Sequence, residues 1–542
     1  MRGKMLSEKA NRVGLLGSFF AVFSLIFLRY LYFGFAYYPQ LDDYIQYHNY
    51  AAMGRLSQMI PYLGLLAARP LAGILDIALW SKFWGNMWVA LLLLSMIFAA
   101  TAIIFYRLFE KIFGTGKLFL LFFALLPLGM EGSYWISASS RLLPGLLFCA
   151  LSASAFYSFL QNRKARFCLF SVALQFLTFC FYEQVAVLSC GLNILIGILL
   201  RKEAKRLWPA AFSCIGVAAV YFLSCKMSGE SALYGTRTAL MLPTSAYYFR
   251  NFLPELFSQF YEVFVRGGAL LLKNGLWRGF SLIAHTNGFW KLAIYLAVCI
   301  LSFFILVREN GKCEKKRSLQ IFCGILLAVL PTAPFFILAN PYFSLRGALP
   351  SLVGIALVLD GAVGAILKKE KFVSLFAVVC AVVFSAVTVS ELADYRANYE
   401  ADQAVVTLIA ETETQGKTVA ILGLKESFLQ SRNFEYHEHI KGVTSSSWAL
   451  TGAVRCVKED IFEKKTYIPY DLTAEFLYKP WNYAEKQIGA VDAVFAYDED
   501  ENVLLPLSVA PAGDGVYDLY DESGEFFGQI VEEDQTARFF RK

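Results

Sequence analysis

Long apolar segments restrict the fold of this chain more than any other feature of its sequence. Eleven segments approach the length of about 20 mostly apolar residues that crosses a bilayer as a helix. They cover 13–36, 86–106, 118–134, 142–160, 167–182, 185–200, 207–225, 289–307, 319–338, 347–367 and 372–390. The first segment is too long for the apolar part of a signal peptide, so we expect it to remain as an anchor.

The composition agrees with a membrane protein. The 542 residues are 57% hydrophobic and 17% charged, whereas soluble domains are about 45–50% apolar and about 25% charged. The net charge of +6 also hides a division within the chain. Residues 391–542 hold 28 acidic and 14 basic side chains, which leaves 15 acidic and 35 basic ones in residues 1–390. The overall charge is therefore no argument for binding nucleic acid.

The basic residues between the segments predict the orientation of the chain, because cytoplasmic loops are enriched in Lys and Arg. Five basic clusters lie at 107–117, 163–166, 201–206, 308–317 and 368–371. With eleven spans and a cytoplasmic N-terminus, all five clusters fall on the inner side. The loops at 37–85, 131–141, around 183, 226–288 and 339–346 then fall outside, together with residues 391–542.

Two further apolar segments are not counted as spans. Segment 60–80 carries Arg69 and Asp76, and segment 253–273 contains Glu255, Glu262 and Arg266. A charge at the centre of a span costs roughly 2.5–3.5 kcal/mol on insertion scales. We therefore expect both segments to form helices in the outer membrane interface. Arg29, inside the first apolar segment, can extend its side chain to the membrane surface.

The acidic tail has the pattern of a small α/β domain. We expect a helix from 391 to about 414 that continues the last span, a buried strand at 418–424 (TVAILGL) and another strand near 515–520. Turns are predicted at 497–501 and around Pro506, Pro511 and Gly513. The predicted fold is a polytopic α-helical membrane protein of about 11 spans (1–390) with a small extracytoplasmic α/β domain (391–542).

An acidic pair follows the first apolar segment, in the sequence Tyr-Tyr-Pro-Gln-Leu-Asp-Asp-Tyr. Asp42 and Asp43 lie just beyond a proline that ends the helix. A carboxylate beside apolar surface holds its proton more tightly, which suits a general base. The alternative interpretation is structural, with Asp42 or Asp43 capping a helix that begins near Tyr44.

This layout resembles that of the GT-C glycosyltransferases. The resemblance consists of an N-terminal span, an outer loop with the pair Asp42-Asp43, interfacial helices, many further spans and a terminal outer domain. It implies that one of these carboxylates acts as the base, or helps to bind a divalent cation such as Mg²⁺ or Mn²⁺. A sugar would then move from a polyprenyl-phosphate carrier to a glycan, lipid or protein acceptor. The resemblance does not say which Asp is the base.

Such a reaction needs cations near the membrane surface, because a lipid phosphate or diphosphate leaves with negative charge. Five outward-facing arginines fit this role. Arg346 is favoured because it lies at the outer end of a span, Arg141 and Arg69 come next, and Arg237 and Arg266 are the remaining candidates. Arginine suits a phosphate because it makes bidentate contacts. The alternative is that each arginine reaches lipid headgroups or pairs with a structural acid.

Three other residues are predicted to contact the substrate. Glu183 joins two apolar segments with almost no polar linker, so it lies at the outer boundary, where it either faces a cavity or holds one of the arginines. Glu131 precedes Gly-Ser-Tyr-Trp, an aromatic surface on which a sugar could stack. His48 is a third, although an isolated His is more often structural.

The leading hypothesis is therefore an integral-membrane glycosyltransferase of the cell membrane that acts on the outer face. A transporter or flippase for lipid-linked sugars would instead place charged residues along a path through the spans. A scaffold or receptor would tolerate replacement of Asp42, Asp43 and Glu183. The absence of a cleavable targeting segment and the few cysteines in the outer loops favour a bacterial source.

Overall fold

A computed structural model describes most of the chain. It covers residues 2–44, 48, 69–200, 214–216, 218, 241, 243–286, 288–307, 316–338, 342–424, 442–460, 462–471, 476–477, 487–533 and 536–541. The segment predicted as a span at 207–225 lies almost wholly outside these residues, as do residues 60–68 of the predicted interfacial segment.

The chain divides into two compact units. Unit 1 comprises Met1–Tyr37, Met59–Leu75 and Asn86–Leu392, and unit 2 comprises Tyr38–Gln58, Asp76–Gly85 and Ala393–Lys542. The sequence placed a boundary at residue 390, whereas here the long loop after the first apolar segment also contributes to the second unit. Asp42, Asp43 and His48 consequently belong to unit 2.

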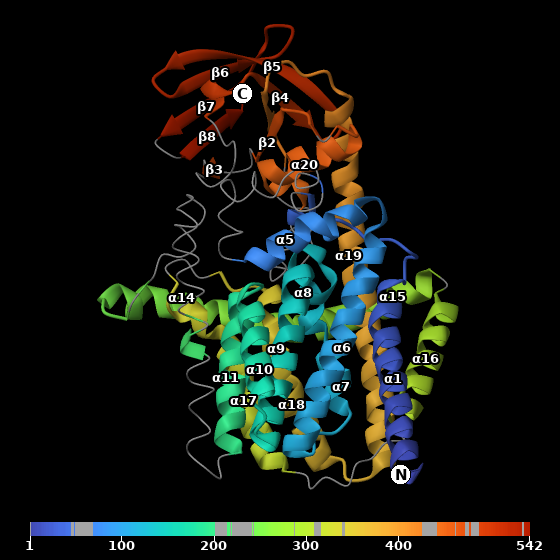
Figure 1. Cartoon of the computed structure of the whole chain (residues 1–542). Helices are drawn as coiled ribbons and strands as arrows, with labels where there is room; N and C mark the ends of the chain where they lie inside the picture. The colour runs from blue at the N-terminus through green and yellow to red at the C-terminus, as the bar shows by residue number, and fades with distance from the viewer. Residues whose placement is uncertain are drawn as a thin grey trace. The chain divides into compact units, whose positions relative to one another are not determined.

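Unit 1 is helical, and its main helices run alongside one another (Figure 1). The helices are α1 (Arg2–Tyr30), α6 (Met87–Phe113), α7 (Leu118–Leu125), α8 (Met130–Tyr134), α9 (Ile136–Asn162), α10 (Ala165–Phe179), α11 (Glu183–Leu199), α14 (Leu253–Phe260), α15 (Gly268–His285), α16 (Phe289–Val307), α17 (Arg317–Val329) and α18 (Ala348–Ile366). Shorter helical turns of unit 1 are η3 (Pro127–Gly129), η5 (Tyr248–Phe252), η6 (Tyr261–Gly267), η7 (Leu330–Phe336) and η8 (Leu345–Gly347), whereas η2 (Trp80–Asn86) belongs to unit 2 up to Gly85. Helices α5 (Pro70–Ala78) and α19 (Glu370–Glu411) each contain a boundary between the units.

Five helical stretches of the described residues are long and apolar enough to cross a membrane. They are Trp80–Phe113, Ile136–Asn162, Arg317–Phe336, Leu345–Ile366 and Lys371–Glu411. Leu16–Tyr30, Ala165–Phe179, Glu183–Leu199 and Phe289–Val298 are apolar but shorter. The membrane character predicted from the sequence is thus supported, while the number of eleven spans stays a prediction.

The predicted span at 118–134 is wrong as a single helix. Helix α7 ends at Leu125, Leu126 is extended with ψ 124°, and η3 and α8 follow as separate short elements. The cause is Pro127, because a proline disfavours helical geometry in the residue before it. This break positions α8, which carries Glu131.

Close helix crossings in unit 1 depend on glycine. A Cβ atom on Gly354 of α18 would lie 2.1 Å from the backbone nitrogen of Ala328 in α17, and one on Gly279 of α15 would lie 1.9 Å from the carbonyl oxygen of Ala386 in α19. Small residues let helix backbones approach closely, and van der Waals contact then holds apolar helices together in lipid.

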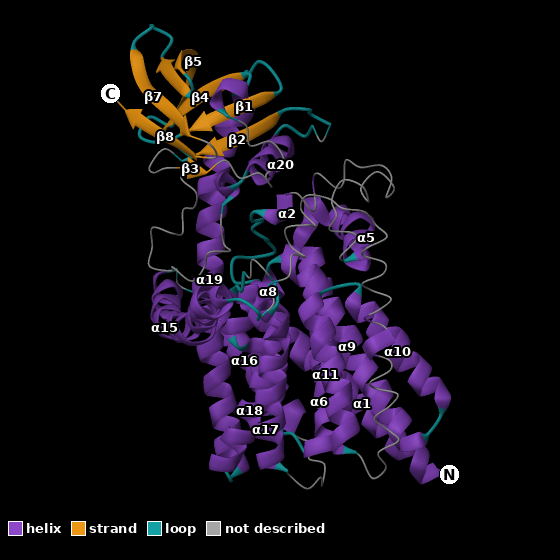
Figure 2. Cartoon of the chain, turned by 90° about the vertical axis from the view of Figure 1, so that its left-hand side faces the viewer, coloured by secondary structure: helices purple, strands orange, loops and turns teal. Residues whose placement is uncertain are grey.

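Unit 2 contains an eight-stranded sheet in the order β2-β1-β4-β5-β6-β7-β8-β3. The strands are β1 (Thr418–Leu422), β2 (Thr466–Tyr470), β3 (Phe476–Leu477), β4 (Ala493–Asp498), β5 (Val503–Gly513), β6 (Val516–Tyr520), β7 (Phe526–Glu533) and β8 (Thr536–Arg541) (Figure 2). Strand β1 pairs in parallel with β2 and β4, and the remaining pairs are antiparallel. The predicted strands at 418–424 and 515–520 are confirmed, as is the helix that continues from the last apolar segment.

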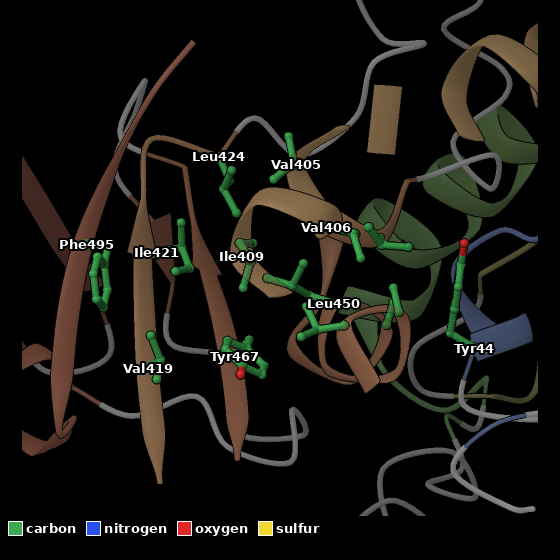
Figure 3. Close-up of a cluster of buried hydrophobic side chains, with 14 residues drawn as sticks. Tyr44, Val405, Val406, Ile409, Val419, Ile421, Leu424, Leu450, Tyr467 and Phe495 are labelled. Carbon is green, nitrogen blue, oxygen red and sulfur yellow. The ribbon is translucent and has the colours of Figure 1, made fainter. Parts of the chain in front are cut away.

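The two faces of β1 belong to two hydrophobic cores, as the alternation of a strand requires. Val419 and Ile421 belong to a core that also contains residues from the end of α19, from α20 (Ser447–Val457) and Tyr44 (Figure 3). Ala420 and Leu422 pack among residues of β2, β4, β5, β6, β7 and β8 on the other face. A strand buried on both faces explains the uninterrupted apolar sequence of residues 418–422.

Two prolines that were predicted to mark turns lie inside strand β5. Pro506 belongs to the half of β5 that pairs with β4, and Pro511 belongs to the half that pairs with β6. Among the described strands, each half therefore pairs along one edge only, and a residue without an N–H group is tolerated at the other edge. The turn predicted at 497–501 lies at 499–502.

Candidate functional site

The acidic pair in unit 2 divides into a buried and a partly exposed carboxylate. Asp43 is fully buried, and its Oδ2 accepts the backbone N–H of Gln40 at 3.0 Å, while its own N–H donates to the Gln40 carbonyl at 2.8 Å. This reciprocal contact is a capping interaction that closes the turn before α2 (Asp42–Tyr44). The structural role that the sequence allowed for the pair is thus present at Asp43.

Asp42 is only partly buried, and its Oδ1 accepts the indole N–H of Trp448 at 3.3 Å. The residue before it, Leu41, has a φ of +34°, in a region that bulky side chains rarely occupy. Such strain persists only where neighbours hold it, and it gathers at functional sites. Of the two carboxylates, Asp42 is the one that can reach a substrate.

Contacts within unit 2 hold this turn in place. The Gln40 amide donates to the Tyr395 carbonyl at 3.1 Å, and Gln403 donates to the Tyr44 hydroxyl at 3.2 Å. A Cβ atom on Gly452 of α20 would lie 3.0 Å from the Tyr44 carbonyl oxygen, so the turn packs closely on α20.

His48 is buried beside the same turn. Its ring meets Trp84 edge to face, with the centroids 5.8 Å apart, and Nδ1 has no hydrogen-bond partner among the described residues. Burial, assisted by the positive charge of Arg455, lowers the pKa of His48 to about 4. The ring is therefore neutral near pH 7 and suits a hydrogen bond better than proton transfer.

In unit 1, Arg69 and Glu183 form a bidentate ion pair. The guanidinium Nε lies 3.0 Å from Oε1 and Nη2 lies 2.8 Å from Oε2, and the guanidinium stacks on the Tyr182 ring at 4.1 Å. The N–H of Leu71 also donates to the Cys180 carbonyl at 3.2 Å. Arg69 and Glu183 were predicted separately to bind substrate. The structure instead joins them in an ion pair, which was the alternative interpretation for each residue. This pair fixes the start of α5 to the bend between α10 and α11.

Glu131 and Arg346 also meet in unit 1. The Arg346 backbone N–H donates to Glu131 Oε1 at 3.2 Å, and the Arg346 guanidinium lies 5.3 Å from the centroid of the Trp135 ring. Among the described residues Arg346 has no carboxylate partner for its guanidinium. The side chain is partly exposed, so it presents a cation held on an aromatic face.

The sequence suggested that the aromatic surface beside Glu131 is open to a sugar. In the structure this surface is buried. Tyr134 and Trp135 are 0% and 1% exposed. Both rings are buried because α8 packs closely against η8, where a Cβ atom on Gly132 would lie 3.0 Å from the Arg346 carbonyl oxygen. Trp135 supports Arg346 instead.

Gln184 lies between the segments that carry these two pairs. Its amide is 3.4 Å from the carbonyl oxygens of both Gly347 and Pro331. Glu183 and Arg346 are thus on adjoining segments of unit 1. Arg141 lies in the second turn of α9 and is half-buried.

Sequence reasoning missed a buried network around Arg29. This side chain is 4% exposed and does not extend to the membrane surface, since it donates to the Leu125 carbonyl at 3.2 Å and the Tyr30 hydroxyl at 2.8 Å. The Tyr30 hydroxyl in turn contacts Ser133 Oγ at 2.9 Å. A cavity of about 260 Å³ is lined by Arg29, Lys291 and apolar residues. An arginine inside the first apolar segment was the only signal, because Leu125 lies 96 residues from Arg29 in sequence and Ser133 lies 103 residues from Tyr30.

The described residues do not form a divalent-cation site. They contain no group of three or more His, Cys, Asp or Glu side chains that could hold a metal ion. Mg²⁺ and Mn²⁺ prefer several oxygen ligands, whereas Asp43 directs an oxygen to the Gln40 backbone. The side chains in this part of the chain therefore do not fit the metal that the resemblance allowed.

No protein-family model matches the chain, and comparison with curated proteins gives no match either.

Proposed function

We propose that the protein is an integral-membrane glycosyltransferase. It transfers a sugar from a polyprenyl-phosphate carrier to a glycan, lipid or protein acceptor on the outer face of the membrane. The observation that carries the proposal is the Arg346 guanidinium, held on Trp135 beside the buried Glu131 without a carboxylate to neutralise it in the described part of unit 1. Such a cation suits a phosphate leaving group.

In the proposed reaction the base is Asp42, a role that rests on the resemblance and on the partial exposure of this carboxylate within unit 2, not on a contact between the units. It takes the proton of an acceptor hydroxyl while the hydroxyl oxygen bonds to the anomeric carbon. The bond from that carbon to the phosphate oxygen breaks on the opposite face, and its electron pair leaves with the polyprenyl phosphate. The anomeric configuration is inverted. Arg346 stabilises the charge that develops on the phosphate.

The remaining predicted residues receive supporting roles. Asp43 holds the turn that presents Asp42, and the Arg69–Glu183 pair holds α5. Glu131 accepts the Arg346 N–H and so positions the η8 turn. Arg141 and His48 stay predictions as substrate contacts, since neither has a contact in the structure that singles out a ligand.

Transfer of a radiolabelled sugar from polyprenyl-phosphate donors tests the proposal in membranes that contain the full chain. Asp42→Asn should lower the turnover number by about 100-fold or more, the usual effect of losing a general base. Asp500→Asn, on an exposed turn of the same unit, is the matched control. Full transfer by both Asp42→Asn and Arg346→Gln would reject the proposed roles. A flippase would move the lipid-linked sugar across the bilayer without joining it to an acceptor.

A further inference from the structure

A second cavity lies at the opposite end of the unit 1 helices from Glu131 and Arg346. It measures about 170 Å³ and lies among the chain segments that join α6 to α7, begin α17, and join α18 to α19. These segments carry three of the basic clusters that the sequence predicts on the inner side of the membrane. None of its residues belongs to the proposed catalytic site.

Cations surround the polar end of this cavity. Lys117, Arg317 and Lys368 line it, together with a single carboxylate, that of Asp360. Among the described residues neither Arg317 nor Lys368 forms an ion pair with a carboxylate. The four formal charges give the lining a net charge of +2.

The carboxylate of Asp360 serves the fold. It accepts N–H groups from Gly116 at 2.8 Å, Phe119 at 3.2 Å and the Gln320 amide at 2.8 Å. These contacts cap the start of α7, where the first backbone N–H groups lack partners within the helix. An anion in the cavity would therefore meet the cations with Asp360 engaged by the backbone.

Apart from Gln320 and Ser374, the rest of the wall is apolar and built mainly from small or branched side chains. The apolar lining includes Val22 and Leu25 of α1, Ala124 of α7, and Ala377 and Ala381 of α19. A free phosphate or a nucleotide has no alkyl chain that could pack against this wall. A molecule with a phosphate head and an alkyl chain matches both ends, and basic pockets between membrane helices bind anionic lipid headgroups.

We propose that this cavity binds an anionic phospholipid from the inner leaflet, with its phosphate at Arg317 and Lys368 and an acyl chain along α1, α7 and α19. The bound lipid would pack between these three helices, and its binding would not depend on sugar transfer.

Native mass spectrometry of the full chain in detergent tests this, with phosphatidylglycerol and phosphatidylcholine as probes. Phosphatidylglycerol should bind more tightly than phosphatidylcholine. Arg317→Gln/Lys368→Gln should weaken it by about 10- to 30-fold, as loss of two surface cations predicts. Lys164→Gln/Arg166→Gln removes two exposed cations from the connection between α9 and α10 and should leave binding unchanged.

A second variant guards against misfolding of the first. A Cβ atom on Gly364 would lie 3.6 Å from the guanidinium carbon of Arg317, an ordinary contact. Gly364→Asp would thus place a carboxylate beside Arg317 and should also weaken phosphatidylglycerol binding. Equal binding of the two lipids, undiminished binding by both variants, or equally effective competition by inorganic phosphate would each overturn the proposal.

Discussion

The two units differ in where their apolar and charged side chains lie. Unit 2 is an acidic sheet domain whose cores follow the alternation of its strands, so the two faces of β1 are both apolar. Unit 1 is helical and mostly apolar, and several of its charged side chains lie at, or cap, breaks and ends of helices. Glu131 lies in the short α8, Glu183 begins α11, and Asp360 caps α7.

The difference shows where function can arise in each unit. In unit 1 the carboxylates of Glu131 and Asp360 accept backbone N–H groups near helix breaks, which offsets the cost of burying them. In unit 2 the partly exposed Asp42 follows a strained turn held by buried neighbours. The two units also pack differently. Helices in unit 1 approach closely at glycines, so adding a side chain there should destabilise the fold. Unit 2 depends on the apolar side chains of its strand cores, so removing one should destabilise it.

The largest expected effect is on the strand core of unit 2. Ile421→Ala should destabilise the fold by about 4 kcal/mol, since Ile421 is 0% exposed and the change leaves a cavity. Val503→Ala, at a side chain 38% exposed, should change stability far less. Thermal unfolding followed by circular dichroism measures both, and equal effects would contradict the importance of the β1 core.

In unit 1 the corresponding destabilising change is the addition of a methyl group at a glycine where two helices cross. Gly354→Ala should cost about 3 kcal/mol, because its Cβ would overlap the Ala328 backbone in α17. Gly85→Ala has open space around the added atom and serves as control. Thermal unfolding in detergent reports the difference. A fully stable Gly354→Ala would show that α17 and α18 do not cross so closely.

The lowered pKa of His48 should make the free energy of unfolding depend on pH. Its pKa is about 4 in the folded chain, below the ordinary value of 6.5, so between these values the unfolded state binds the proton more readily. The His48 contribution is complete above pH 6.5 and is lost as the pH falls towards 4, by on the order of 2 kcal/mol. The difference in unfolding free energy between the wild type and His48→Gln isolates this contribution, and a difference constant from pH 7 to pH 4 would contradict it.

The smallest effect belongs to the Arg69–Glu183 pair. A double-mutant cycle with Arg69→Gln and Glu183→Gln should give a coupling of about 1 kcal/mol, because the pair is bidentate and only partly exposed. The exposed Arg266–Glu262 pair should give about 0.3–0.5 kcal/mol. Zero coupling for Arg69–Glu183, with loss of transfer in each single variant, would favour a direct role on substrate.

Local patterns allowed part of this structure to be predicted. The apolar sequence at 418–424 identified strand β1, and the proline at 127 could have indicated the break before α8. Glu131 and Arg346 were both selected from the sequence, yet their contact joins residues 215 positions apart. The Arg69–Glu183 pair and the Arg29–Tyr30–Ser133 network likewise depend on tertiary packing, which one sequence does not encode locally. Pro506 and Pro511 misled because a strand that changes partners midway has free edges.

Single-turnover sugar transfer, measured with donor binding on the same purified full-length protein, tests the assignment of Asp42 and Arg346 most directly. We expect Asp42→Asn to bind a polyprenyl-phosphate sugar normally and to transfer it about 100-fold more slowly, whereas Arg346→Gln should weaken both binding and transfer. Transfer by Asp42→Asn at the wild-type rate, or no transfer by the wild type from any polyprenyl-phosphate sugar, would contradict the proposed reaction.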